Sequence, residues 1–381
     1  MSWPLVKLTD VCDVIMGQAP DGSSYNETGE GVPLLAGAGD FGEKTPIPKK
    51  FTTEAGKISQ SGDLILCIRA TIGDLNWSDR DYCLGRGVAG LRVIKDRLDA
   101  SYLWHFISTH KHELASKGTG STFKQVNRTH IAEWEIPLPP LPEQKRIAGI
   151  LDNADAIRHK RQQAIQLADD FLRAVFLNMF GELVTSSGYA RSQKYKLLEL
   201  VDYIDYRGKT PEKSEYGVPL ITAKNVKGGY VDDEPREYIP EENYDAWMTR
   251  GFPRKNDVLF TTEAPLGNVA LLGEYEKVAI GQRLVALRSK GRVTHEYLLY
   301  LLLHPFVQDL IYARSSGSTV KGIRTKELYA IEIPVPDIQK QIEFSAAYWK
   351  GKSLMNIQES AYQLAVLKFS ALSQRAFAGQ L

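Results

Sequence analysis

The sequence predicts an α+β protein made of two repeated globular domains and two long helices, which pair as an antiparallel coiled coil with pseudo-twofold symmetry. Three observations lead to this prediction. The chain has 381 residues, which is too long for one compact core. Its second half repeats the motifs of the first half in the same order. Each half ends in a long segment whose apolar side chains recur every three to four positions.

Five pairs of motifs define the repeat. The matched stretches, first half before second, are KLTDVCDVIMGQAP with KLLELVDYIDYRGKTP, GVPLL with GVPLI, GDLILCIRATIGD with NDVLFTTEAPLGN, GRGVAGLRV with GQRLVALRS, and GSTFKQVNRTHIAEWEIPLP with GSTVKGIRTKELYAIEIPVP. Because these pairs extend from one end of each half to the other, each half is one domain followed by one long helix.

Each predicted domain mixes short strands with one amphipathic helix. Runs such as DLILCIRA and DVLFTT are bounded by Gly, Pro, Asn and Asp, which is typical of strands joined by turns. In the first half, we expect Ser101 to cap a helix that carries Leu103, Phe106, Ile107 and Leu114 on one face. In the second half, Thr294 is the expected cap of a helix with Leu298, Leu301 and Leu302.

The first long helix is expected to begin at Pro142, since proline is tolerated at a helix start. Between Pro142 and Gly181 there is no further proline and a single glycine, Gly149. Counting by alternate threes and fours predicts a coiled-coil seam. The seam residues named on this helix are Ile147, Ile150, Ala154, Ile157, Ala164, Ala168, Phe171 and Val175.

The second long helix has a less regular seam. Its predicted members are Leu354, Ile357, Ala361 and Leu364, and Gly351 is expected to loosen an early turn. A helix of this length spans about 55 Å. The predicted domain boundaries are residues 1–141 for the first globular domain, 142–181 for the first long helix, 182–336 for the second domain and 337–381 for the second long helix.

Composition limits the compartment and the partners. Lys and Arg total 47 against 46 Asp and Glu, so any binding to nucleic acid depends on local patches and not on net charge. The three cysteines, Cys12, Cys67 and Cys83, have no metal-ligand spacing and are expected to be buried, reduced thiols. Without a signal sequence or a long apolar run, the sequence predicts a cytoplasmic protein.

The sequence lacks the motifs of several enzyme classes. Tyr203 stands where a Walker A loop ending in GKT needs its first glycine, and no dinucleotide-binding fingerprint follows a strand. PLPPLP lacks the leading Asn or Asp of the amino-methyltransferase motif. Glu143 and Lys145 have the spacing of a nuclease pair, but in a first helical turn Glu favours the helix dipole. We therefore expect no catalytic residues, no metal and no cofactor bound by this chain.

Basic residues recur at the same point in both halves. Lys124 and Lys321 follow the two GST loops, where small residues let backbone N–H groups approach phosphate oxygens. Variable polar stretches between the repeated motifs supply candidates for reading bases. The predicted DNA-binding residues are Arg86, Lys117, Thr119, Ser121, Thr122, Lys124, Arg207, Lys209, Lys224, Asn225, Arg283, Arg314, Ser318, Thr319, Lys321 and Arg324. The alternative is a flexible surface loop.

The stretch IPLPPLPEQKRIAGILD, the GST loop before it and the second copy IPVP with QKQI resemble the specificity subunit of a type I restriction-modification system. The resemblance covers the whole chain, including its duplication. It implies a non-catalytic protein with two target-recognition domains, each reading one half of a bipartite site in double-stranded DNA. The two long helices would set the spacing between the half-sites.

The resemblance also implies partners. Two modification subunits, which are adenine methyltransferases that use S-adenosylmethionine, would dock on the helices, and ATP-dependent, Mg-requiring restriction subunits would join the same assembly. The second copy departs from the family pattern, because PDIQKQI lacks the proline and glutamate of LPEQ. Three alternatives remain: a stand-alone nuclease or methyltransferase, a coiled-coil scaffold whose globular ends bind protein, and a specificity subunit that serves a fused nuclease-methyltransferase.

Overall fold

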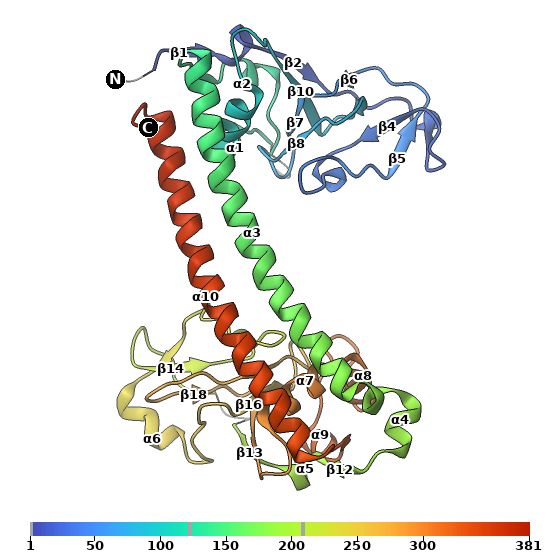
Figure 1. Cartoon of the computed structure of the whole chain (residues 1–381), viewed down its shortest axis with the longest axis vertical. Coiled ribbons are helices and arrows are strands. Elements are labelled where there is room, and N and C mark those ends of the chain that lie inside the picture. Colours follow the sequence, from blue (N-terminus) through green and yellow to red (C-terminus); the bar gives the residue numbers. More distant parts are fainter. Residues whose placement is uncertain (1–2, 121–123, 207–209) are drawn as a thin grey trace. The chain divides into compact units, whose positions relative to one another are not determined.

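The computed structural model describes residues 3–120, 124–206 and 210–381, and these divide into two compact units. Unit 1 contains residues up to 163 together with residues 359–381, and unit 2 contains residues 164–358. Both ends of the chain therefore belong to unit 1 (Figure 1). Each unit is α+β, and the two repeat the same plan, as the sequence predicts.

Unit 1 is built on an antiparallel four-stranded sheet with the order β2-β10-β7-β8. A five-stranded sheet, β3-β5-β4-β9-β6, and the short pair β1-β11 complete it. The strands are β1 (Leu5–Lys7), β2 (Cys12–Met16), β3 (Tyr25–Asn26), β4 (Val32–Leu35), β5 (Lys50–Thr52), β6 (Ile58–Ser59), β7 (Leu64–Cys67), β8 (Leu75–Trp77), β9 (Tyr82–Leu84), β10 (Val88–Val93) and β11 (Glu135–Pro137). The helices are α1 (Ala100–Ser116), α2 (Arg128–Ala132), the first part of α3 (Leu141–Phe180) and the last part of α10 (Ile338–Phe377).

Unit 2 repeats the four-stranded sheet as β13-β19-β16-β17 and adds β15-β14-β18 and β12-β20. The strands are β12 (Lys194–Lys196), β13 (Val201–Asp205), β14 (Val218–Ile221), β15 (Tyr238–Ile239), β16 (Val258–Thr261), β17 (Val269–Leu271), β18 (Ala279–Ile280), β19 (Leu284–Ser289) and β20 (Glu332–Pro334). The helices are the last part of α3, α4 (Ser186–Arg191), α5 (Leu197–Leu200), α6 (Tyr244–Trp247), α7 (His295–Leu303), α8 (Pro305–Ala313), α9 (Thr325–Tyr329) and the first part of α10. The equivalence of β10 with β19 and of β7 with β16 follows the repeat.

Of the two predicted helix caps, the one in unit 2 is confirmed and the one in unit 1 is wrong. Thr294 caps α7, because its hydroxyl accepts a hydrogen bond from the N–H of Tyr297 at 3.2 Å. In unit 1 the cap is Asp99 and not Ser101, since the Asp99 carboxylate accepts from the N–H of Tyr102 at 3.0 Å. Asp is as good a cap as Ser, and it stands two positions earlier.

The long helices pack together inside each unit, in opposite directions. In unit 1, Ile147 and Leu151 near the start of α3 share a buried core with Ala376 near the end of α10. In unit 2, Phe176 near the end of α3 shares a core with Phe344 near the start of α10. The antiparallel pairing of the two helices is thus observed in both units (Figure 1).

The predicted seam is correct in part. Its half-buried members are Ile150, Ala154, Ala164, Ala168 and Val175 on α3 and Ala361 on α10. Ile147 is fully buried as predicted. The five predicted seam residues Ile157, Phe171, Leu354, Ile357 and Leu364 are instead between 51% and 62% exposed. The reason is the helical period: an α-helix has 3.6 residues per turn, so counting by 3.5 drifts about 20° per heptad away from the buried face. The buried positions follow the longer period, and they include Leu151, Leu172, Phe176 and Phe180 on α3.

Gly351 of α10 lies against Leu172 of α3 in unit 2. A Cβ atom at this position would lie 2.8 Å from one methyl group of Leu172. The glycine therefore permits close contact between the two helices, which is a different role from the loosened turn that the sequence predicts.

A buried glutamine attaches each long helix to its own domain. Gln144 of α3 is completely buried. Its Oε1 accepts from the N–H of Asp99 at 2.8 Å, and its Nε2 donates to the carbonyls of Arg97 and Pro139, both at 2.9 Å. The glutamine thus joins the start of α3 to the cap of α1 and to the segment before it.

The same arrangement occurs in unit 2. Gln341 of α10 is also completely buried, and its Oε1 accepts from the N–H of Thr294 at 2.9 Å. Its Nε2 donates to the carbonyls of Arg292 at 3.2 Å and Pro336 at 2.9 Å. Hence the departure of the second copy from the LPEQ pattern keeps the one residue that makes these bonds.

The cysteines and the acidic residue of the first helical turn have structural roles. Cys12, Cys67 and Cys83 are free and buried, as the sequence predicts. Burial raises the pKa of Cys12 to about 12, so this thiol stays protonated near neutral pH. Glu143 forms an ion pair with Arg146 at 2.7 Å.

No helix in the described part of the chain has the length and apolar character needed to cross a membrane.

Candidate nucleic-acid interface

Three loops of unit 1 meet at one end of its four-stranded sheet. They are the segment after β7, the turn 85–87 before β10, and the hairpin around Lys124. The N–H of Ile68 donates to the carbonyl of Gly87 at 2.9 Å, and the N–H of Val126 donates to the carbonyl of Ile68 at 3.1 Å. These bonds place the three loops side by side, and we call them the loop surface of unit 1.

Unit 2 has the same loop surface, built by the same bonds. The N–H of Thr262 donates to the carbonyl of Arg283 at 3.0 Å, and the N–H of Ile323 donates to the carbonyl of Thr262 at 2.9 Å. The loops enclose a hollow of about 500 Å³. It is lined by Thr262, Glu263, Gln282, Arg283, Ser316, Gly317, Val320, Gly322, Ile323 and Arg324.

Several predicted DNA-binding residues of unit 1 lie exposed on its loop surface. They are Arg86, Lys117, Thr119 and Lys124. Thr119 and Gln125 exchange two backbone hydrogen bonds, at 3.0 and 2.9 Å, which close the hairpin that carries Lys124. Ser121 and Thr122 were also predicted here and lie outside the described residues.

The loop surface of unit 2 brings together more of the predicted residues. Exposed in or beside it are Arg283, Arg314, Ser318, Thr319, Lys321 and Arg324. Ser316 and Gly322 exchange backbone hydrogen bonds at 2.8 and 2.9 Å, and so close the hairpin that carries Lys321. Lys124 and Lys321 therefore occupy equivalent places, each one residue before the residue that closes its hairpin.

Asn225 is not available for a DNA contact. It is buried, and its amide nitrogen donates to the carbonyls of Asp232 and Pro235, both at 3.0 Å. Its oxygen accepts from the N–H and the hydroxyl of Thr222, at 3.0 and 2.9 Å. All of these bonds hold a turn together, so the prediction for Asn225 is corrected to a structural role. Arg207 and Lys209, predicted nearby, lie outside the described residues.

A carboxylate partly neutralises the cations near Asn225. Glu237 contacts Lys213 at 2.8 Å and the predicted DNA-binding residue Lys224 at 3.6 Å. Burial would raise the pKa of Glu237, but the two lysines outweigh this effect and lower the pKa. Lys224 is exposed, yet its charge is balanced within the protein.

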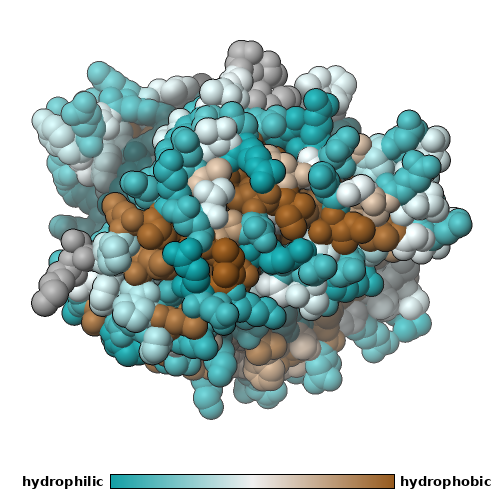
Figure 2. Space-filling model, turned by 90° about the horizontal axis from the view of Figure 1, so that it is seen from above, coloured by the Kyte–Doolittle hydropathy of each residue, from teal (hydrophilic) through white to brown (hydrophobic). Residues whose placement is uncertain are grey.

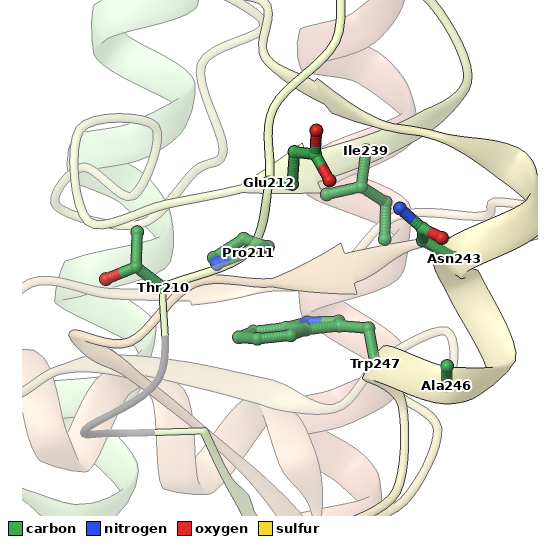
Figure 3. A pocket seen from close by; sticks show the side chains of 7 residues that line it. All are labelled: Thr210, Pro211, Glu212, Ile239, Asn243, Ala246 and Trp247. Carbon is green, nitrogen blue, oxygen red and sulfur yellow. The ribbon is translucent and has the colours of Figure 1, made fainter.

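A second hollow in unit 2, of about 220 Å³, has an aromatic side chain as its floor (Figure 3). In this view the indole of Trp247 extends beneath Pro211, and Glu212, Ile239 and Asn243 lie above the indole as well. The back of the indole stacks on Tyr206, with 5.4 Å between ring centroids. Unlike the loop surface, this hollow belongs to a region where the sequences of the two halves differ.

The sequence analysis did not identify two equivalent arginine–aspartate pairs, one in each unit. Arg92 pairs with the buried Asp63 at 2.8 Å, and Arg288 pairs with the buried Asp257 at 2.6 Å. These four residues are aligned in the repeat, which is the signal that could have found them. It also missed Arg69, whose Nε donates to Oε1 of Gln125 at 2.7 Å on the loop surface.

The surface of the molecule has no continuous apolar face in the view of Figure 2, where apolar side chains gather in patches bordered by hydrophilic ones. The two loop surfaces instead combine exposed cations, small residues and closed hairpins. A duplicated α+β chain with one such surface in each repeat has the features of a protein that binds a polyanion at two places.

The comparisons with known proteins identify the family. The model of the type I restriction modification DNA specificity domain matches residues 2–167 and 191–345, which is more than half of the chain. The protein therefore belongs to the family of type I restriction-modification specificity subunits. Such subunits carry DNA specificity and are not the catalytic subunits of their enzymes.

Several curated relatives are specificity subunits. The EcoBI specificity subunit of Escherichia coli is 22% identical over 100% of this chain and 86% of its own length. A putative MjaX specificity subunit of Methanocaldococcus jannaschii is 36% identical, but the match covers 44% of this chain and 40% of that protein. The chain thus matches less than half of the length of this second relative.

Two solved structures share the fold. The S subunit of a type I restriction-modification system from M. genitalium matches with a TM-score of 0.63 and 14% identity, over 99% of this chain and 96% of that one. A chain from a study of complex assembly and conformational transition of the type I system matches with a TM-score of 0.57 and 19% identity, over 100% and 98%. The predicted fold class and family are confirmed.

Proposed function

We propose that each repeat of this specificity subunit, residues 1–141 and residues 182–336, is a target-recognition domain that reads one half of a bipartite DNA site. The observation that carries the proposal is the repeated loop surface with its exposed lysines, Lys124 and Lys321. The two surfaces share their backbone bonds and differ in their side chains. One scaffold with two sets of side chains favours an asymmetric site.

The long helices, residues 142–181 and 337–381, would set the gap between the half-sites. Helices α3 and α10 each have 40 residues, so each extends about 60 Å. A turn of B-DNA is about 34 Å long, so one such helix is longer than one turn of the duplex. We infer an unread spacer between the two half-sites.

The helices also offer surfaces for the partner subunits. In unit 2, Leu167, Phe171 and Ile357 project from α3 and α10 and are each more than 60% exposed. Large exposed apolar side chains on long helices fit docking sites for other proteins. We propose that two modification subunits dock there and that restriction subunits join the assembly. S-adenosylmethionine, ATP and Mg would be bound by these partners, in the cytoplasm where the DNA is.

The salt dependence of DNA binding tests the assignment. In the chain co-purified with its methyltransferase partner, the double variant Lys124→Ala and Lys321→Ala should bind every duplex more weakly. The slope of log affinity against log salt should fall by roughly two, because each lost phosphate contact releases about one counterion fewer. Fluorescence anisotropy at several salt concentrations measures both effects.

A matched control uses lysines at the opposite ends of β10 and β19, the strands that follow the loop surfaces. Lys95 follows β10 and Lys290 follows β19, each at the end opposite the loop surface. The variant Lys95→Ala with Lys290→Ala should keep the slope. Equal slopes for the wild type and both double variants would show that the loop surfaces do not contact DNA. An assembled complex that binds no duplex would contradict the proposed function itself.

A further inference from the structure

Each loop surface holds one arginine by its Nε atom. In unit 1, Nε of Arg69 donates to Oε1 of Gln125 at 2.7 Å. In unit 2, Nε of Arg283 lies 2.9 Å from Oε1 of Glu263. An arginine held through Nε still has the end of its guanidinium, where each terminal nitrogen directs one N–H outward, and the planar group fixes the direction of that end.

The two arginines come from different loops, but these loops lie side by side at the equivalent position of each unit. Arg69 and Glu263 are aligned in the repeat, after β7 and β16. Gly87 and Arg283 are likewise aligned, before β10 and β19. In both units a backbone hydrogen bond joins these two loops, from Ile68 to Gly87 at 2.9 Å and from Thr262 to Arg283 at 3.0 Å. The arginine has thus changed loops between the repeats while its location has been kept.

A steric constraint explains why unit 1 does not use the position of Gly87. A Cβ atom there would lie 2.2 Å from the carbonyl oxygen of Ala36, so no side chain fits. The second possible source is the loop after β7, and this is where Arg69 lies. In unit 2 the position after β16 carries Glu263, which instead holds the arginine supplied by the other loop.

The backbone at this place is fixed in both units. Ala70 and Ala264, which follow Arg69 and Glu263, have φ angles of 56° and 48°. This left-handed conformation is costly for alanine and persists only where the surroundings impose it. Antiparallel bridges from Arg69 to Gln125 and from Glu263 to Gly322 provide that constraint. A guanidinium on a rigid backbone loses less entropy when it binds a ligand.

We propose that Arg69 and Arg283 are the guanine-reading residues of the two half-sites, and that Gln125 and Glu263 aim them. The inference rests on the proposed function. A guanidinium that presents two terminal nitrogens matches the O6 and N7 acceptors of guanine in the major groove, which is the commonest specific protein–DNA contact. Lys124 and Lys321, exposed on the adjacent hairpins, then contact the flanking phosphates.

The alternative is that the contacts of Arg69 with Gln125 and of Arg283 with Glu263 only stabilise the local structure. The side chains of Arg283 and Glu263 are 48% and 47% exposed, and ion pairs of that exposure contribute little to stability. That alternative predicts no change in base preference when either arginine is removed. The two explanations therefore differ in specificity and not in stability.

Selection from a pool of randomised duplexes, by the chain assembled with its methyltransferase partner, distinguishes them. Relative base frequencies in the selected pool cancel any uniform loss of affinity. Arg69→Ala should lower the preference for one G·C pair by about tenfold or more in one half-site, and should leave the other half-site unchanged. Arg283→Ala should do the same in the other half-site only.

The aiming residues supply the matched controls. Gln125→Ala should relax the same base pair as Arg69→Ala. Glu263→Gln keeps an acceptor oxygen and should retain the preference, whereas Glu263→Ala should lose it. Thermal unfolding of each variant close to that of the wild type shows that the change lies in recognition.

The outcomes separate the inference from the proposed function. A wild-type pool without a bipartite site removes the proposed function and the inference with it. A wild-type bipartite site whose base frequencies stay the same in Arg69→Ala and Arg283→Ala overturns the inference alone. So does a loss spread evenly over all positions, since that is the signature of phosphate contacts.

Discussion

At the scale of single residues, the buried glutamines Gln144 and Gln341 hold the long helices to their domains. Each uses both ends of its amide and bonds three backbone groups that surround the start of its helix. Because the orientation of a recognition domain on its helix fixes where its loops meet DNA, these bonds bear on specificity as well as on stability.

Gln144→Ala should lower the free energy of unfolding by about 2–4 kcal/mol, because it leaves a buried carbonyl of Pro139 and part-buried backbone groups of Arg97 and Asp99 without their partner. Urea unfolding measures the change. The control is Gln162→Ala, at an exposed position of the same helix, which should change stability by less than about 0.5 kcal/mol. Equal effects of the two substitutions would show that the buried bonds contribute nothing.

His304 gives unit 2 a pH-dependent helix cap. Its Nδ1 accepts a hydrogen bond from the N–H of Phe306 at 3.2 Å, at the start of α8, and only an unprotonated nitrogen accepts. Burial lowers the pKa of His304 below its usual range. The unfolded chain therefore takes up a proton first as the pH falls.

The stability contributed by this cap is present above the ordinary histidine pKa, about 6.5, and is lost as the pH falls below it. We expect the urea midpoint of the wild type to decrease between pH 7.5 and 5.5. His304→Asn, which keeps a capping oxygen that does not titrate, should decrease less. Parallel curves for the two proteins would refute the role of His304.

At the scale of elements, heptad counting predicts only part of the face by which the paired helices pack. Leu172 is buried against α10, whereas its neighbour Phe171 is 62% exposed. The buried face follows 3.6 residues per turn, so that Ile147 lies on both the predicted and the observed stripe while Ile157 and Phe171 do not.

Leu172→Asp should lower the free energy of unfolding by at least about 3 kcal/mol, because it removes a buried apolar side chain and buries a carboxylate without a partner. Phe171→Asp in the isolated chain should have little effect. Urea unfolding followed by circular dichroism compares the two. A larger loss for Phe171→Asp would restore the heptad register.

These elements also show what sequence reasoning could reach. The ends of the long helices follow from prolines and from the repeat, and they are observed at Leu141–Phe180 and Ile338–Phe377. The buried face does not follow, because apolar residues such as Phe171 and Leu167 occur on both sides of α3. Only the packing partner decides which of them is buried.

The loop surface shows the same limit. Lys124 and Lys321 were recognisable because the repeat aligns them. Arg69 was not, because its partner Gln125 is 56 residues away and its equivalent in the second repeat is a glutamate. Asn225 was assigned to DNA from its residue type and its place in a polar stretch that differs between the halves, and the bonds that bury it cannot be read from the sequence.

At the scale of the whole molecule, duplication explains how one chain can recognise two different sequences. The scaffold of each unit, with its sheet, its glutamine bonds and its hairpin, is kept. The side chains on the loop surfaces and around the hollow whose floor is Trp247 differ between units. Specificity would therefore vary in one half-site without change in the other.

Recognition of a bipartite site is tested by selecting bound duplexes from a randomised pool, with the wild-type chain assembled with its methyltransferase partner. We expect two short enriched blocks of different sequence, separated by a random gap of constant length. A single block, a gap of variable length or no enrichment, from a complex shown to be folded and assembled, would contradict this expectation.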